Sequence, residues 1–211
     1  MRIVDLSHLI EPTMPVFPGT EPPVLAAANT IARDGFAEKK ITLFSHTGTH
    51  IDAPAHMLAE AKTLDQYAAQ DFYGRAVLAD VSANRMEYIG LEQLAGLGES
   101  LKHADFLILR TGWAERWGSA AYYEDFPALT PEAARWALGF GLKGIGTDAI
   151  SIDRMPDHDF PIHYLLFGAG LFVIENLTHL DQVGHEFTLG CFPLHLQHAD
   201  GAPVRAVAFV E

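Results

Sequence analysis

Short runs of apolar residues, bounded by polar residues, glycine or proline, recur along the chain and predict β-strands. Most of these runs are continuously apolar, which indicates buried strands, whereas residues 38–45 alternate between polar and apolar side chains. The predicted strands span residues 2–6, 38–45, 76–81, 105–111, 143–147, 171–174, 186–194 and 203–210.

The clearest predicted helix begins at Thr130-Pro131-Glu132. The threonine can cap free amide groups, the proline suits the first turn, and the glutamate lies at the positive end of the helix dipole. This helix is expected to pass Trp136 and to end near Gly139 or Gly141. Shorter helices are predicted over residues 63–72, 91–97 and 164–169, with Gly98 as the terminator of the second. Helices and strands therefore mix, without a regular βαβ alternation.

Residues 11–23 contain five of the chain's twelve prolines, which excludes a helix and predicts a stiff, extended loop. Phe17 is a large aromatic residue on this loop. It either anchors the loop to the core or forms an apolar wall of a substrate pocket.

The segment from His46 to His56 holds three histidines and one aspartate within eleven residues. Imidazole nitrogen and carboxylate oxygen are the usual ligands of zinc, manganese and iron at catalytic sites. Gly48, the β-branched residues beside it and Pro54 disfavour a helix. In an extended segment alternate residues share a face, so His46, His50 and Asp52 are expected to point to one side.

We therefore predict that these three side chains bind a metal, delivered by the strand over residues 38–45, which leads directly into His46. His56 lies beyond the turn at Pro54 and is expected to enter the same pocket without being a ligand. The alternative is a polar loop whose histidines are exposed or hydrogen-bonded in the core. Four potential ligands in one pattern favour the metal site, but their spacing does not select the metal.

Two residues of the second half are candidates to complete the site. Glu175 ends an apolar strand, where an unpaired carboxylate would be costly to bury. His163 is the last residue of an acidic segment of loop character over residues 151–163. Each also has a simpler explanation, because Glu175 could pair with an arginine and His163 could be exposed.

The composition favours a globular protein of one domain over a nucleic-acid-binding or membrane protein. A chain of 211 residues with 49% hydrophobic residues fits one domain with a full core, here residues 1–211. A net charge of −13 repels nucleic acid and anionic membranes, and no apolar run is long enough to span a membrane. Without a signal-peptide pattern, and with Cys191 as the lone cysteine, we expect a cytoplasmic protein without disulfides.

The pattern His46-x-Gly48-Thr49-His50-x-Asp52-x-Pro54-x-His56 resembles the signature of the metal-dependent cyclase-like hydrolase family. That family includes bacterial kynurenine formamidase (arylformamidase) and isatin hydrolase. The resemblance covers nearly the whole chain, with further similar blocks at residues 3–7, 18–19, 148–153, 173–177 and 202–206.

The resemblance implies a role for each candidate. His46, His50 and Asp52 are ligands, with Asp52 bridging two ions, and His163 and Glu175 complete the second ion's shell. His56 is implied as the proton donor and acceptor. Phe17 matches an aromatic position against the substrate ring.

The fold implied is α/β, a mixed sheet with a barrel-like core flanked by helices, of the swivelling β/β/α type. The activity implied is hydrolysis of an aryl formamide such as N-formyl-L-kynurenine, a step of tryptophan catabolism, by hydroxide formed from metal-bound water. Two zinc ions are the expected cofactor, with manganese as the alternative. The expected partners are a small-molecule substrate and further copies of the chain, as a homodimer or homotetramer.

Two alternatives remain open: a one-metal, manganese-type hydrolase of a cyclic amide such as isatin or of another small amide or ester, and a non-catalytic metal-binding or ligand-binding protein. The chain also departs from the formamidases at two places. Asp157-His158-Asp159 stands before His163 where they tend to carry a Ser-Lys and Ser-His pattern, and Asn176 replaces their glycine after Glu175.

Overall fold

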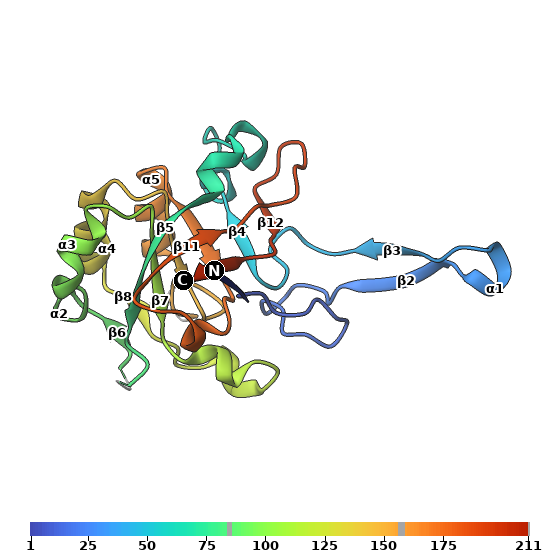
Figure 1. Ribbon diagram of the computed structural model, residues 1–211, viewed down its shortest axis with the longest axis horizontal. Coiled ribbons are helices and arrows are strands. Elements are labelled where there is room, and N and C mark those ends of the chain that lie inside the picture. Colours follow the sequence, from blue (N-terminus) through green and yellow to red (C-terminus); the bar gives the residue numbers. More distant parts are fainter. Residues whose placement is uncertain (84–85, 156–158, 211) are drawn as a thin grey trace.

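The computed structural model describes residues 1–83, 86–155 and 159–210. Its centre is a curled sheet of nine strands with helices packed on one face (Figure 1). In spatial order the strands are β1 (Arg2–Asp5), β13 (Val207–Val210), β11 (Glu186–Gly190), β5 (Tyr73–Asp80), β7 (Phe106–Arg110), β9 (Gly144–Thr147), β10 (Phe172–Glu175), β4 (His50–Asp52) and β12 (Gly201–Pro203). This mixed α/β fold with a half-closed barrel confirms the expected fold class.

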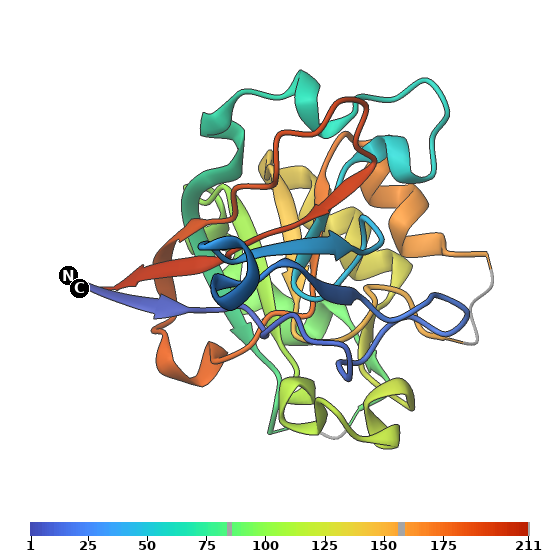
Figure 2. The same ribbon diagram turned by 90° about the vertical axis from the view of Figure 1, so that its right-hand side faces the viewer.

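The sheet has a parallel centre and antiparallel flanks. Strands β5, β7, β9 and β10 run parallel, and helices connect them in sequence. The middle of the chain therefore does follow a βαβ order, and the expectation of no regular alternation was wrong there. The other five strands pair antiparallel, and β1 and β13 bring the two chain ends side by side (Figure 2).

The apolar strands are explained by burial on both faces of the sheet. In β5, Ala76 and Leu78 belong to one hydrophobic cluster, while Val77 and Ala79 belong to another. The first cluster also takes residues from the antiparallel flanks, and the second is covered by α2, α4 and α5. Because both sides of such a strand are dry, its sequence is apolar without alternation.

The helices are short. They are α1 (Ile31–Asp34), α2 (Leu91–Leu94), α3 (Gly98–Leu101), α4 (Pro131–Ala137) and α5 (Pro161–Gly168). The 3-10 turns are η1 (Pro54–His56), η2 (Leu64–Gln66), η3 (Ala69–Phe72), η4 (Ala95–Leu97), η5 (Trp113–Arg116), η6 (Ala120–Tyr123), η7 (Leu138–Phe140) and η8 (Leu180–Gln182).

The start of α4 confirms its prediction, since the Thr130 hydroxyl accepts a hydrogen bond from the Ala133 amide at 3.1 Å. Three other helix predictions need correction. Residues 63–72 form two separate 3-10 turns, Gly98 begins α3 instead of ending a helix, and α5 starts three residues before the predicted position. His163 therefore lies in a helix and not in a loop.

Three strand predictions also change. The strand predicted over residues 186–194 ends at Gly190 as β11. Residues 203–210 split into β12 and β13, and the strand predicted over residues 38–45 ends at Thr42 as β3 (Glu38–Thr42). β3 pairs with β2 (Val24–Asn29) in a separate hairpin, closed by α1, that projects from the body (Figure 1). It therefore does not lead directly into His46. We call residues 24–42 the β2–β3 arm.

A smaller parallel pair joins β6 (Tyr88–Ile89) to β8 (Ala128–Leu129). The departures noted at Asp157 and His158 lie outside the described residues. Among the residues that the structure describes, none of the helices is long and apolar enough to cross a membrane.

Candidate metal centre

The site is built on β4, which lies between β10 and β12 in the sheet. The antiparallel register places His50 opposite Glu175 and Asp52 opposite Val173. On the other side, Gly201 lies opposite Asp52. Because alternate residues of a strand share a face, His50 and Asp52 point to the same side of the sheet.

A first group of ligand atoms surrounds one oxygen of Asp52. Its Oδ1 lies 2.6 Å from Nδ1 of His46 and 3.2 Å from Nε2 of His50. His46 reaches this position from a turn before β4, so the prediction of one extended face holds only for residues 50–52. Gly48 has a φ of +66°, which lets the chain turn between the two histidines.

A second group faces the other oxygen of Asp52. Nε2 of His163, from α5, lies 3.9 Å from Asp52 Oδ2 and 3.3 Å from Glu175 Oε1. All these side chains are buried except that of His46, which is partly exposed. In each group the ligand atoms lie within 4.8 Å of one another, so Asp52 belongs to two sets of three candidate ligands.

The outward nitrogens of two histidines are held by hydrogen bonds. Nδ1 of His50 donates to the Gly48 carbonyl at 2.7 Å, and Nδ1 of His163 donates to Asp153 at 2.7 Å. Such bonds fix the tautomer and leave the opposite nitrogen free to bind a metal. The donor set of imidazole nitrogens and carboxylate oxygens fits a divalent cation.

A third group, which the sequence analysis did not find, contains His46, His56 and Asp200. Asp200 Oδ2 lies 2.9 Å from Nε2 of His46 and 3.5 Å from Nδ1 of His56. The imidazole rings of the two histidines are 3.9 Å apart. Asp200 precedes β12 in a polar stretch with no periodic pattern, so the sequence held no local signal for it.

The acidic groups make the site strongly favourable for positive charge. Burial lowers the pKa of His46, but Asp52 and Asp200 outweigh burial and raise this pKa to about 10. Burial likewise opposes the charged form of His163, yet Asp153 and Glu175 raise its pKa to about 10. A field that holds protons on these two histidines at neutral pH also attracts a divalent cation.

His56 behaves in the opposite way. Burial and the neighbouring charge of His46 lower the pKa of His56. Its imidazole is therefore neutral at pH 7 and able to accept a proton.

Asn176 and Tyr122 hold the turn that precedes β4 through a chain of hydrogen bonds. The fully buried Tyr122 hydroxyl donates to Asn176 Oδ1 at 2.7 Å, and Asn176 Nδ2 donates to the Gly48 carbonyl at 2.9 Å. That carbonyl also holds His50. Asn176 has a φ of +58°, a left-handed conformation that asparagine tolerates better than most residues.

A pocket of about 340 Å³ opens directly onto these groups. It contains all seven residues predicted for the site, which are Phe17, His46, His50, Asp52, His56, His163 and Glu175. Apolar side chains, including Val16, Phe44, Met57 and Phe160, form much of its wall. Phe17 lies in this wall and is 36% exposed, so it is not an anchor buried in the core.

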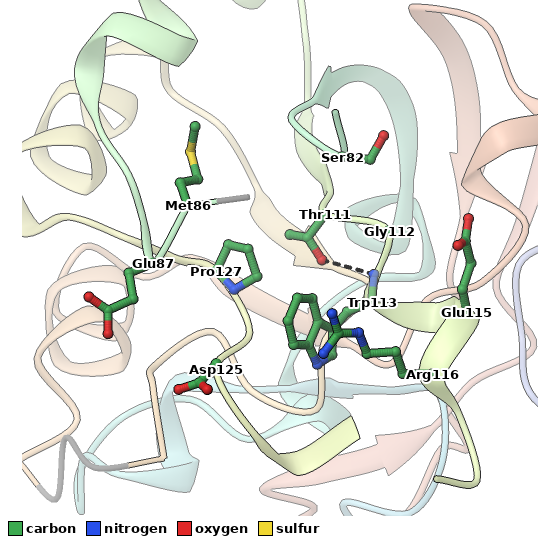
Figure 3. A pocket seen from close by; sticks show the side chains of 10 residues that line it. All are labelled: Ser82, Met86, Glu87, Thr111, Gly112, Trp113, Glu115, Arg116, Asp125 and Pro127. Carbon is green, nitrogen blue, oxygen red and sulfur yellow. Dashed lines mark hydrogen bonds between the residues drawn. The ribbon is translucent and has the colours of Figure 1, made fainter. Parts of the chain in front are cut away.

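A larger pocket of about 650 Å³ lies elsewhere, beyond the ends of β5 and β7 (Figure 3). The Arg116 guanidinium stacks on the Trp113 ring at 3.8 Å, and Glu87 and Asp125 lie on another side. None of the groups of candidate metal ligands found in the described part of the chain lies there. The groups of candidate metal ligands found in the described residues therefore lie at the 340 Å³ pocket and not at this one.

Comparisons with known proteins agree with this site. Residues 4–154 match the model of the Cyclase family, described as "Putative cyclase". The kynurenine formamidase of Bacillus cytotoxicus is 33% identical over 207 residues, covering 97% of this chain and 95% of the relative. That of Geobacillus thermodenitrificans is 32% identical over 206 residues, covering 96% and 95%.

Solved structures give the same result. Isatin hydrolase A from Labrenzia aggregata superimposes with a TM-score of 0.90 at 29% identity, covering 99% of this chain and 93% of that one. A structure described as a predicted metal-dependent hydrolase from Bacillus stearothermophilus gives 0.83 at 27% identity, covering 100% and 98%.

The fold and the site thus define a metal-dependent hydrolase, an enzyme that uses a divalent metal. The chain belongs to the Cyclase family.

Proposed function

We propose that this enzyme hydrolyses the amide bond of an aryl formamide, with N-formyl-L-kynurenine as the leading candidate. The observation that carries the proposal is the convergence of two ligand groups on Asp52, beside the neutral His56, in a pocket with apolar walls. The likeness to kynurenine formamidases along nearly their whole length supports this substrate class.

The proposed cofactor is a pair of zinc ions, with manganese as the alternative. His46 and His50 would hold one ion, His163 and Glu175 the other, and Asp52 would bridge the two. Bound there, a divalent ion supplies a Lewis acid that lowers the pKa of water and polarises a carbonyl oxygen.

His56 is proposed to move the proton. Water adds its oxygen to the formyl carbon, and His56 accepts the proton that the water loses. The carbon–nitrogen bond then breaks, and His56 returns the proton to the departing aromatic amine while formic acid is released, which then loses its proton to the solvent. A neutral imidazole in contact with the pocket suits this exchange, since it is a base before the attack and an acid after it.

The aromatic ring of the substrate is proposed to lie against Phe17. This side chain is partly exposed at the pocket wall, and Phe44 and Phe160 offer further apolar surface there. Offset contacts between aromatic rings are worth about 0.5–1.5 kcal/mol beyond the burial of area. Phe17→Ala is therefore expected to act mainly on KM.

Hydrolysis of N-formyl-L-kynurenine by chelator-stripped protein, with and without added zinc or manganese, tests the proposal. Turnover that returns with metal supports it. Bound metal without turnover of this substrate contradicts it.

A second candidate is the hydrolysis of a cyclic amide such as isatin. None of the described residues that line the pocket is a lysine or arginine. The carboxylate of N-formyl-L-kynurenine would find no lysine or arginine side chain to pair with among them, whereas isatin is neutral. The TM-score of 0.90 to isatin hydrolase A points the same way. Measuring both substrates on one metal-loaded preparation separates the two candidates.

We also propose that the protein is a homodimer or homotetramer joined by the β2–β3 arm. An isolated two-stranded hairpin is marginally stable in water, and this arm exposes several apolar side chains, namely Val24, Ile31, Phe36 and Ile41. The arm carries three basic and two acidic residues, whereas the whole chain has a net charge of −13. Its weakly positive charge complements the acidic body of a second copy.

A further inference from the structure

A backbone hydrogen bond fixes Asp200 to the end of β4. Its carbonyl oxygen accepts a hydrogen bond from the Ala53 amide at 2.8 Å, one residue beyond Asp52. The next residue, Gly201, begins β12 and pairs with Asp52 across the sheet. Residues 200 and 201 are thus held in register with the centre of the site, although they lie far from it in the sequence.

The carboxylate of Asp200 hydrogen-bonds to the imidazole nitrogen of His46 that points away from Asp52. The imidazole Nε2 donates to Asp200 Oδ2 at 2.9 Å, while Nδ1 faces Asp52 at 2.6 Å. A proton kept on Nε2 leaves the lone pair on Nδ1, the atom that faces the first ligand group.

Gly201 supplies the space for the same ring. A Cβ atom at this position would lie 2.5 Å from Cε1 and 2.9 Å from Nε2 of His46. Any other residue would therefore push the imidazole out of its place. Asp200 thus accepts a hydrogen bond from His46, and Gly201 leaves the space that the His46 ring occupies.

Asp200 also differs from the other groups that hold the histidine ligands. The Gly48 carbonyl holds His50 and Asp153 holds His163, whereas the Asp200 carboxylate lies near two imidazoles. Its second neighbour is Nδ1 of His56 at 3.5 Å. The position of the proposed proton-transfer residue is thereby linked to that of a proposed ligand.

We propose that Asp200 is a positioning residue of the metal centre, and that Gly201 is required for its geometry. The Asp200 carboxylate fixes the tautomer and orientation of His46 and restrains His56. The effect on His56 rests on the proposed function, whereas the effect on His46 concerns metal binding alone.

The test measures zinc affinity by competition with a chromogenic chelator, without any substrate. Asp200→Ala removes the acceptor, Asp200→Asn keeps the shape but loses the charge, and Gly201→Ala places a methyl group against the ring. Asp181→Ala, an exposed aspartate in η8, is the matched control. Loss of such an outer partner weakens metal binding by about 10–100-fold.

We expect Asp200→Ala and Gly201→Ala to lose zinc affinity by that factor, Asp200→Asn to lose less, and Asp181→Ala to match the wild type. At saturating zinc the number of bound ions should be unchanged in all variants. Unchanged affinity in Asp200→Ala would overturn the proposal. One ion fewer at saturation would also overturn it, because Asp200 would then be a ligand itself.

The result does not depend on the substrate, so the proposal can fail while the formamidase activity stands, and the reverse. Thermal unfolding of the metal-free variants checks that they fold. If Asp200→Ala does not fold, Asp200→Asn carries the comparison, and wild-type affinity in that variant would contradict a role for the charge.

Discussion

Asp52 is the side chain that two groups of candidate ligands share, because its two oxygens face different groups. Oδ1 lies near His46 and His50, and Oδ2 faces His163. The carboxylate is almost fully buried, and burial alone would raise its pKa. The charges of His46 and His50 instead hold that pKa well below its usual value, so Asp52 is ionised and able to bind cations.

At the same scale, His56→Ala is expected to keep both metal ions and to lose turnover by about 10²–10⁴-fold, the usual contribution of a general acid or base. Metal content by elemental analysis and steady-state kinetics measure the two effects. His103→Ala, at an exposed site, is the control and should leave both unchanged. Loss of an ion from His56→Ala would show that this residue is a ligand, as its place in the third group allows.

Tyr122→Phe tests the support behind the ligand strand. The change removes the hydroxyl that donates to Asn176 and leaves a buried amide oxygen without this donor. An unsatisfied buried polar group costs about 1–3 kcal/mol. We expect urea denaturation of the metal-free protein to give a free energy of unfolding lower by that amount.

Tyr123→Phe changes the adjacent, less buried tyrosine in the same way and serves as the control. It should alter the free energy of unfolding by less than about 0.5 kcal/mol. Equal losses in the two variants would contradict the role given to Tyr122.

Among the elements, those with strong local signals were predictable. The apolar runs of β5, β7 and β10 follow from burial on both faces, and the start of α4 follows from its cap. The β2–β3 arm was not predictable as such. Its strand β2 is rich in alanine and gives no strand signal, so the sequence could not assign β3 to a separate hairpin.

A substitution in the β2–β3 arm tests the proposed assembly into a homodimer or homotetramer. Ile31 lies at its tip, is 72% exposed and begins α1, where aspartate is well tolerated. Ile31→Asp should therefore leave the chain folded but weaken contact with an acidic second copy. Light scattering should give two or four times 23.1 kDa for the wild type and a lower mass for the variant.

Ala120→Asp adds the same charge at an exposed position of η6 and should not change the mass. A wild-type protein of 23.1 kDa would contradict assembly. An unchanged mass in Ile31→Asp would contradict the part assigned to the arm.

For the molecule as a whole, topology creates the site. The segment 46–56 can be recognised locally, and its ligand types and spacing predicted a metal site. His163 and Glu175 were candidates from their places beyond an acidic loop and at a strand end, and the family resemblance gave them the role of ligands. Asn176 and Asp200 were missed as contributors because strand pairing across the sheet brings the adjacent residues Glu175 and Gly201 to the site. Asp153 was missed because its role depends on contacts with the start of α5, ten residues further along the chain.

The most direct test of the central claim is hydrolysis of N-formyl-L-kynurenine by chelator-stripped protein, before and after zinc is restored, with isatin measured in parallel. The account predicts no turnover of either substrate without metal and hydrolysis of the formamide once zinc is bound. Turnover of isatin but not of the formamide would show that the substrate is a cyclic amide. Hydrolysis at full rate by the stripped, metal-free protein would contradict the metal-dependent account itself.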